Sequence, residues 1–130
     1  DQYYTFSMFD AQAWYARDAI LGRINLPGES DMRADVEMWQ CREEALEDPI
    51  QDIDFQTDYC KDLSEKVDYS LDWDLAADNF KRWEHHKEES IVSYRDQSHP
   101  SPVTNTKAPI HHTPWWEAMD DSAESFLGKS

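Results

Sequence analysis

The chain has 130 residues, with 28 aspartates and glutamates against 12 lysines and arginines, and a formal net charge of −16. A surface this acidic disfavours nucleic acid and anionic membranes as partners, and no apolar run is long enough to cross a bilayer. Six tryptophans, six tyrosines and five phenylalanines nevertheless provide the apolar material for folded helices.

Residues 9–24 are predicted to form a helix that is apolar around most of its circumference. Ser7 and Asp10 have the spacing of a capping box, and Gly22 lies near the end, where helix C-caps favour glycine. We expect so apolar a helix to be buried against a partner layer, with its first-turn amides facing an anion or an electron-rich ligand edge. One apolar line along it consists of Phe9, Ala13, Ala16 and Ile20.

Three further amphipathic helices are predicted at about residues 30–46, 53–67 and 73–94, separated by breaker and capping residues. Residues 97–112 show no periodicity, and a loop of this length is commonly functional or clamped across a neighbour. A short last helix is predicted over residues 113–126. As an isolated chain, the sequence is therefore mainly α, with four to five helices and long loops.

The sequence contains no recognisable motif for binding a metal ion or a nucleotide phosphate. There is no G-x-G-x-x-G motif after a strand, so the chain carries no dinucleotide phosphate cradle and is not expected to be an enzyme by itself. Adjacent histidines, as in 85–86 and 111–112, point about 100° apart on a helix and do not chelate as an i, i+4 pair would. We predict no metal site, and interpret Cys41 and Cys60 as reduced, packed thiols.

Residues 1–14, which read Asp-Gln-Tyr-Tyr-Thr-Phe-Ser-Met-Phe-Asp-Ala-Gln-Ala-Trp, resemble a segment of the bacterial flavin-containing monooxygenases, in particular the group that oxidises trimethylamine. The resemblance continues in family order to the end of the chain. Its further blocks are residues 16–24, 83–87, 94–96 and 108–115.

The resemblance implies that the chain is the C-terminal portion of an α/β flavoprotein with two dinucleotide-binding domains. Residues 1–24 would end the FAD-binding domain as a flavin-facing loop and a buried helix. Residues 25–130 would form a helical extension with a clamping loop at about 97–112. The expected partners are the N-terminal remainder of the same enzyme and a second protomer of a homodimer, in the cytoplasm.

The implied activity is NADPH- and FAD-dependent N-oxygenation of small methylated amines, with trimethylamine converted to its N-oxide through a C4a-hydroperoxyflavin. Sulfides and other amines stay open as substrates. The alternative function, from the composition alone, is an independent acidic helical interaction module without a cofactor.

The resemblance also assigns roles within the opening block. The family pattern Q-x-x-T places Gln2 and Thr5 on FAD, while Asp1 would contact NADP and Tyr3 would line the substrate pocket. Without the resemblance, this block is interpreted as a capped helix start with no ligand.

Two later residues complete the expected site. Trp83 would wall the substrate pocket, where its ring could face a cationic amine, and Arg95 would contact NADP through its guanidinium. From the residues alone, Trp83 is interpreted as a core residue, since it continues the line of Ala76 and Phe80. Arg95 would then be a solvated charge at a helix end.

Overall fold

The computed structural model describes residues 2–107, which form four α-helices and one 3-10 turn. No strand occurs in this part of the chain, where pairing is limited to an isolated bridge between Pro100 and Lys107. The mainly helical prediction is confirmed for this range, while the predicted helix over 113–126 lies outside it. The elements are α1 (Thr5–Ile20), α2 (Glu29–Glu44), α3 (Pro49–Glu65), α4 (Trp73–Glu89) and η1 (Tyr94–Asp96).

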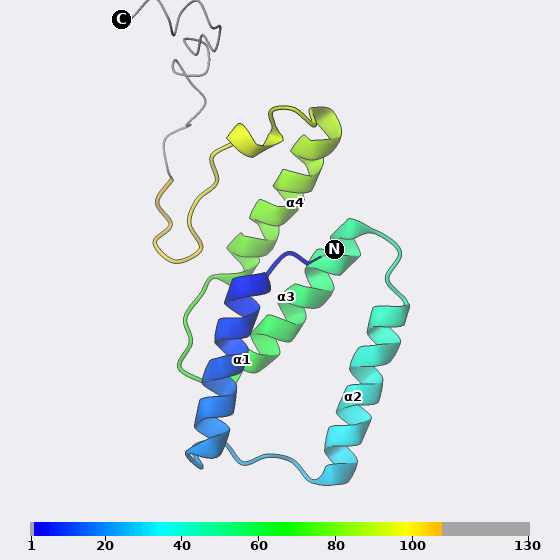
Figure 1. Cartoon of the computed structure of the whole chain (residues 1–130), viewed down its shortest axis with the longest axis vertical. Coiled ribbons are helices and arrows are strands. Elements are labelled where there is room, and N and C mark those ends of the chain that lie inside the picture. Colours follow the sequence, from blue (N-terminus) through cyan, green and yellow to red (C-terminus); the bar gives the residue numbers. More distant parts are fainter. Residues whose placement is uncertain (1, 108–130) are drawn as a thin grey trace, which may run out of the picture.

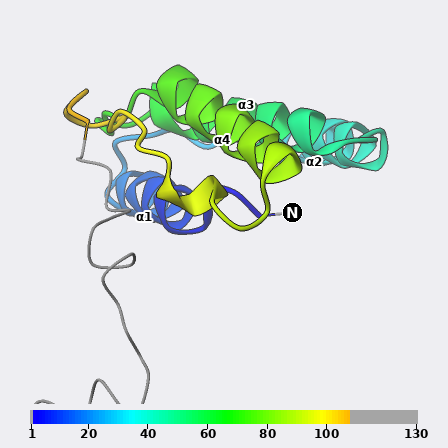
Figure 2. The same ribbon diagram turned by 90° about the horizontal axis from the view of Figure 1, so that it is seen from above.

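Helices α3 and α4 lie side by side in one layer, and α1 packs beneath them (Figure 2). Helix α2 stands at the far side of α3, away from α4 (Figure 1). Tyr3 bonds to α3, so the opening residues described and the later helices meet in the middle of the molecule (Figure 1).

The core is centred on Tyr4, the residue that precedes α1. Its side chain is 2% exposed, and its ring packs edge-on against Phe80 at 4.9 Å and Trp73 at 5.7 Å between centroids. Its hydroxyl shares a 2.7 Å hydrogen bond with the hydroxyl of Thr57. Ala11 is fully buried, and its small side chain lets α1 lie close against the neighbouring helices. These contacts fix where α1 starts and which side of it faces inward.

The predicted N-cap at Ser7 is wrong. Helix α1 begins at Thr5, so Ser7 and Asp10 both lie inside the helix, and Tyr4 occupies the N-cap position without a side-chain cap. Burial of Tyr4 in the core starts the helix earlier than local capping chemistry predicts. The interpretation of Gly22 is confirmed, because this glycine has a φ of +69° just after the helix ends.

The apolar line predicted to be buried on α1 is exposed in the described part of the chain. Phe9 is 58% exposed and Ile20 is 84% exposed, and Ala13 and Ala16 lie on the same open side. The inward side instead carries Ala11, with Met8 and Tyr15 packed at its edges. Residues 2–107 therefore cover only one side of a helix that is apolar on two.

Periodicity over residues 30–46 also predicts an inward stripe of Met32, Val36, Trp39 and Leu46, and this prediction is wrong for the first two. Met32 is 41% exposed and Val36 is 53% exposed, and none of the helix is fully buried. Only Trp39 packs inward, with its ring 5.5 Å from both Phe55 and Tyr59 on α3. The ring of Trp39 and the ion pair of Arg42 with Asp58 at 2.6 Å thus join α2 to α3.

Helix α4 is shorter than predicted. It ends at Glu89, and Ser90 adopts an extended conformation before the chain turns into η1. The sequence Ser90-Ile91-Val92-Ser93 disfavours helix, because β-branched residues and serines both have low helix propensity. The break carries Tyr94 back over α4, where its side chain is buried.

Two isoleucines provide a matched test of this packing. Ile53 is fully buried, so Ile53→Ala should lower the free energy of unfolding of the 130-residue chain by about 2–5 kcal/mol. Ile20→Ala should change it by less than about 0.5 kcal/mol, because the side chain is 84% exposed. Urea unfolding measures both, and equal losses would contradict the packing described.

His99 gives the fold a pH dependence. Burial lowers the pKa of His99 below its ordinary value of 6.5, and its Nε2 atom is buried without a hydrogen-bond partner. The unfolded chain therefore takes up the proton first, so stability should fall as the pH drops through about 6.5. His99→Gln should reduce the fall in melting temperature between pH 7 and pH 5. An unchanged slope would show that other groups cause the acid sensitivity.

Candidate functional site

The opening segment is held by polar contacts from two helices. The backbone amide of Tyr3 donates to Oε1 of Gln56 on α3 at 2.9 Å, and the Tyr3 hydroxyl donates to Oε1 of Glu84 on α4 at 2.8 Å. Gln56 and Glu84 are each only 6% exposed. Together with the Tyr4–Thr57 bond, these contacts place the start of α1 in one defined position.

The first turn of α1 has the features of an anion-binding helix end. It has no side-chain cap and no acidic residue, so its amides and the positive end of the helix dipole are unopposed there. Thr5 is half-buried at the first helical position, and Gln2 is exposed with its side-chain amide 3.6 Å from the sulfur of Met8. An electron-rich ring edge, such as that of a flavin, fits this chemistry. Asp1 lies outside the described residues.

Trp83 and Arg95 meet around Tyr94. The rings of Trp83 and Tyr94 are 5.0 Å apart, and the guanidinium carbon of Arg95 lies 4.4 Å from the Tyr94 ring centroid. Trp83 is half-buried and Arg95 is exposed. The ammonium of Lys87 lies 5.1 Å from the Trp83 ring, so this ring already has a cation as its neighbour.

One buried carboxylate joins these two groups of residues. Glu84 follows Trp83 in α4, accepts from Tyr3, and pairs through both oxygens with Lys87 at 3.2 Å. The structure thereby brings the predicted positions Tyr3 and Trp83 to the same part of α4, with Arg95 one residue beyond the buried ring that packs on Trp83.

The tyrosines of the opening segment stay protonated at neutral pH. Burial, and then the hydrogen bond to Glu84, raise the pKa of Tyr3 well above its usual value. Burial raises the pKa of Tyr4 to about 12. Neither phenol is therefore suited to act as a base in this region.

The histidines, cysteines and carboxylates of the described residues form no further site. Within residues 2–107, no three His, Cys, Asp or Glu side chains could hold a metal ion, and no helix could cross a membrane. Cys41 and Cys60 are both free, but only Cys60 is packed, so the prediction of a packed thiol is wrong for Cys41.

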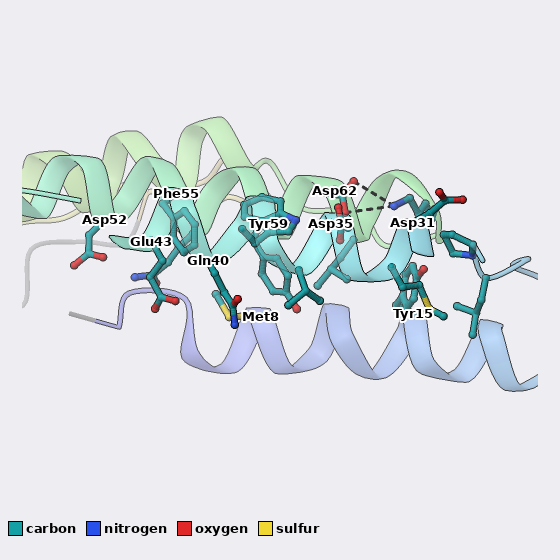
Figure 3. A pocket seen from close by; sticks show the side chains of 18 of the residues that line it. Met8, Tyr15, Asp31, Asp35, Gln40, Glu43, Asp52, Phe55, Tyr59 and Asp62 are labelled. Carbon is teal, nitrogen blue, oxygen red and sulfur yellow. Dashed lines mark hydrogen bonds and ion pairs between the residues drawn. The ribbon is translucent and has the colours of Figure 1, made fainter. Parts of the chain in front are cut away.

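A groove of about 940 Å³ lies between α1, α2 and α3, and no motif or periodicity predicted it. Met8 and Tyr15 project from α1 toward the side chains of α2 and α3 (Figure 3). Gln2 and Gln56 also line the groove, so it reaches the opening segment. Its wall is aromatic and acidic, with side chains that include Trp39, Phe55, Tyr59, Asp31, Asp35, Glu43, Asp52 and Asp62.

Glu84 and Gln56 are the residues that sequence reasoning missed. Glu84 has a local signal, since Lys87 follows it at i+3 on the same helix face as an ion-pair partner. Its bond to Tyr3 spans 81 positions, however, and that of Gln56 spans 53. No local pattern reports contacts at such separations.

No family model matches the chain. Trimethylamine monooxygenases from Pelagibacter ubique strain HTCC1002 and Methylocella silvestris are each 54% identical over 130 residues, or 99% of this chain. The one from Roseovarius nubinhibens is 53% identical over 129 residues. The chain spans 29% of the length of each of these relatives.

A solved structure agrees with these relatives. The crystal structure of Tmm from Pelagibacter sp. strain HTCC7211 matches with a TM-score of 0.84 at 52% identity, covering 98% of this chain and 29% of that one. The chain is thus similar over nearly its whole length to the C-terminal portion of the trimethylamine monooxygenases, which confirms the family resemblance of its sequence blocks.

Proposed function

We propose that the chain is the C-terminal part of an FAD- and NADPH-dependent monooxygenase that converts trimethylamine to its N-oxide. The observation that carries this proposal is identity above 50% to trimethylamine monooxygenases along 99% of the chain. The activity belongs to the whole enzyme, and this part closes and shapes its site. The same similarity gives no support to an independent acidic interaction module.

The start of α1 would hold the flavin. Gln2, Thr5 and the uncapped first-turn amides would face the pyrimidine edge of FAD, where negative charge gathers when the ring is reduced. Bound FAD supplies the reducing and oxygen-activating chemistry that no side chain in this chain provides. The role of the protein groups is to orient the ring and stabilise its charge.

Arg95 and Asp1 would contact NADP. The guanidinium of Arg95 is exposed beside a buried tyrosine, so it is held on one side and open on the other. A planar guanidinium suits phosphate and ribose oxygens through paired hydrogen bonds.

Tyr3 and Trp83 would wall the substrate pocket. Both are partly buried aromatic side chains anchored by neighbours, Phe80 for Tyr3 and Tyr94 for Trp83. Such walls exclude water and fit the methyl groups of a small amine or sulfide.

The proposed division between residues 24 and 25 is supported by the two-sided helix α1. Its open apolar line would dock on the N-terminal remainder of the enzyme, with residues 25–130 as the helical extension. The clamping loop proposed at about 97–112 begins after η1, and only its part up to residue 107 is described.

The two free thiols suit the reducing cytoplasm. A homodimer is also part of this proposal.

Trimethylamine-dependent NADPH oxidation by the full-length enzyme tests the proposed function. Arg95→Ala should raise the KM for NADPH about tenfold, the effect of one lost charge-assisted contact, while the FAD content stays unchanged. Arg33→Ala is the matched control, since Arg33 is an exposed arginine on α2 that pairs only with Glu29 in the described structure. No trimethylamine-dependent turnover by the wild type would refute the proposal.

The docking of α1 is tested by truncating its open line. In the full-length enzyme, combined Phe9→Ala and Ile20→Ala should lower the melting temperature by several degrees and release FAD more readily, because both side chains would be buried there. Val92→Ala is the control, since Val92 is 88% exposed and lies off this line. Equal, small shifts for both variants would contradict docking on this face.

A further inference from the structure

Glu84 is a buried carboxylate with partners from two distant parts of the chain. Its side chain is 8% exposed, and it accepts from the Tyr3 hydroxyl at 2.8 Å and from the Lys87 ammonium at 3.2 Å. A buried carboxylate is costly unless it is paired and hydrogen-bonded. Both partners are therefore held firmly in place by the same group.

Of the two partners of Glu84, Tyr3 belongs to the wall of the proposed pocket and Lys87 contacts the other wall residue, Trp83. The ring of Tyr3 packs against Phe80 at 5.5 Å, and the Lys87 ammonium lies 5.1 Å from the ring of Trp83. We infer that Glu84 is a positioning residue that fixes Tyr3 and Lys87 and keeps the Tyr3 hydroxyl turned away from the substrate. This inference rests on the proposed function, which places Tyr3 and Trp83 in the substrate pocket.

The direction of the Tyr3 hydroxyl matters for the chemistry of a tertiary amine. Such an amine has no N–H group, and its nitrogen lone pair is the nucleophile that takes the oxygen atom. A phenol donor pointing into the pocket would hydrogen-bond that lone pair and compete with oxygen transfer. Tyrosine has a single hydroxyl proton, and Tyr3 donates its one hydrogen bond to Glu84. The ring of Tyr3 then acts as a wall that offers no donor to the amine.

Substitution of Glu84 in the full-length FAD-containing enzyme tests this role. Glu84→Met fills a similar volume but removes the acceptor, and should lower kcat/KM for trimethylamine about tenfold at unchanged FAD content. Glu84→Gln keeps an acceptor oxygen for Tyr3 and should retain most of the activity. Glu88→Met is the matched control, because Glu88 is exposed on the same helix. Glu84→Ala replaces Glu84→Met should the latter fail to fold.

A double variant separates positioning from general stability. Tyr3→Phe removes the hydroxyl, so Glu84→Met combined with Tyr3→Phe should be no worse than Glu84→Met alone, and should recover part of the lost kcat. The inference would be overturned by any of three results. These are a double variant whose loss in kcat/KM is the product of the two single losses, a Glu84→Gln variant as impaired as Glu84→Met, and a Glu84→Met variant whose kcat/KM is within twofold of the wild type. An inactive wild-type enzyme would instead refute the proposed function.

Discussion

The fold depends on the anchoring of the opening residues by groups 53 and 81 positions further along the chain. Tyr4 fills the space between α3 and α4, while the amide and hydroxyl of Tyr3 bond to one side chain from each helix. This anchoring sets the direction of α1 and leaves its first-turn amides without a side-chain cap. In the proposed enzyme, the orientation of the flavin edge would follow from the packing of two tyrosines against the helical extension.

Helix α1 explains why burial is harder to predict than helix formation. Its composition predicts an apolar helix on both sides, and a helix of that kind must be covered on both. The described chain covers the side with Ala11, because a small residue there allows close approach, and leaves the side with Phe9 and Ile20 open. Periodicity identifies the apolar sides of a helix, but the shape of the neighbouring helices decides which side they cover. For the open line, that partner would be the N-terminal remainder of the enzyme.

The sequence predicted the four described helices, because periodic apolar residues, prolines and acidic caps are local signals. Asp72 caps α4 from the loop predicted to hold capping residues, by accepting from the amide of Leu75. Asp48 caps α3 at Pro49, four residues before the predicted start of that helix. The start of α1 was mispredicted, since the burial of Tyr4 outweighs the capping box pattern. For the site, the motif blocks led to Tyr3 and Trp83, whereas Glu84 could be recognised only once the fold had brought α4 against the opening segment.

The proposed NADP contact lies in a strongly acidic chain, so the positions of its few cations matter for binding. A chain with 28 acidic and 12 basic residues has few cations to place, and most of its ion pairs lie on the surface, where each contributes little. Several cations of the described residues lie over aromatic rings, and Lys87 and Arg95 do so next to the proposed pocket. A strongly acidic surface would repel an anionic dinucleotide, so binding NADP requires positive charge concentrated locally. Glu84 neutralises Lys87, and in the proposed enzyme Arg95 would offer an exposed guanidinium to the phosphate of NADP.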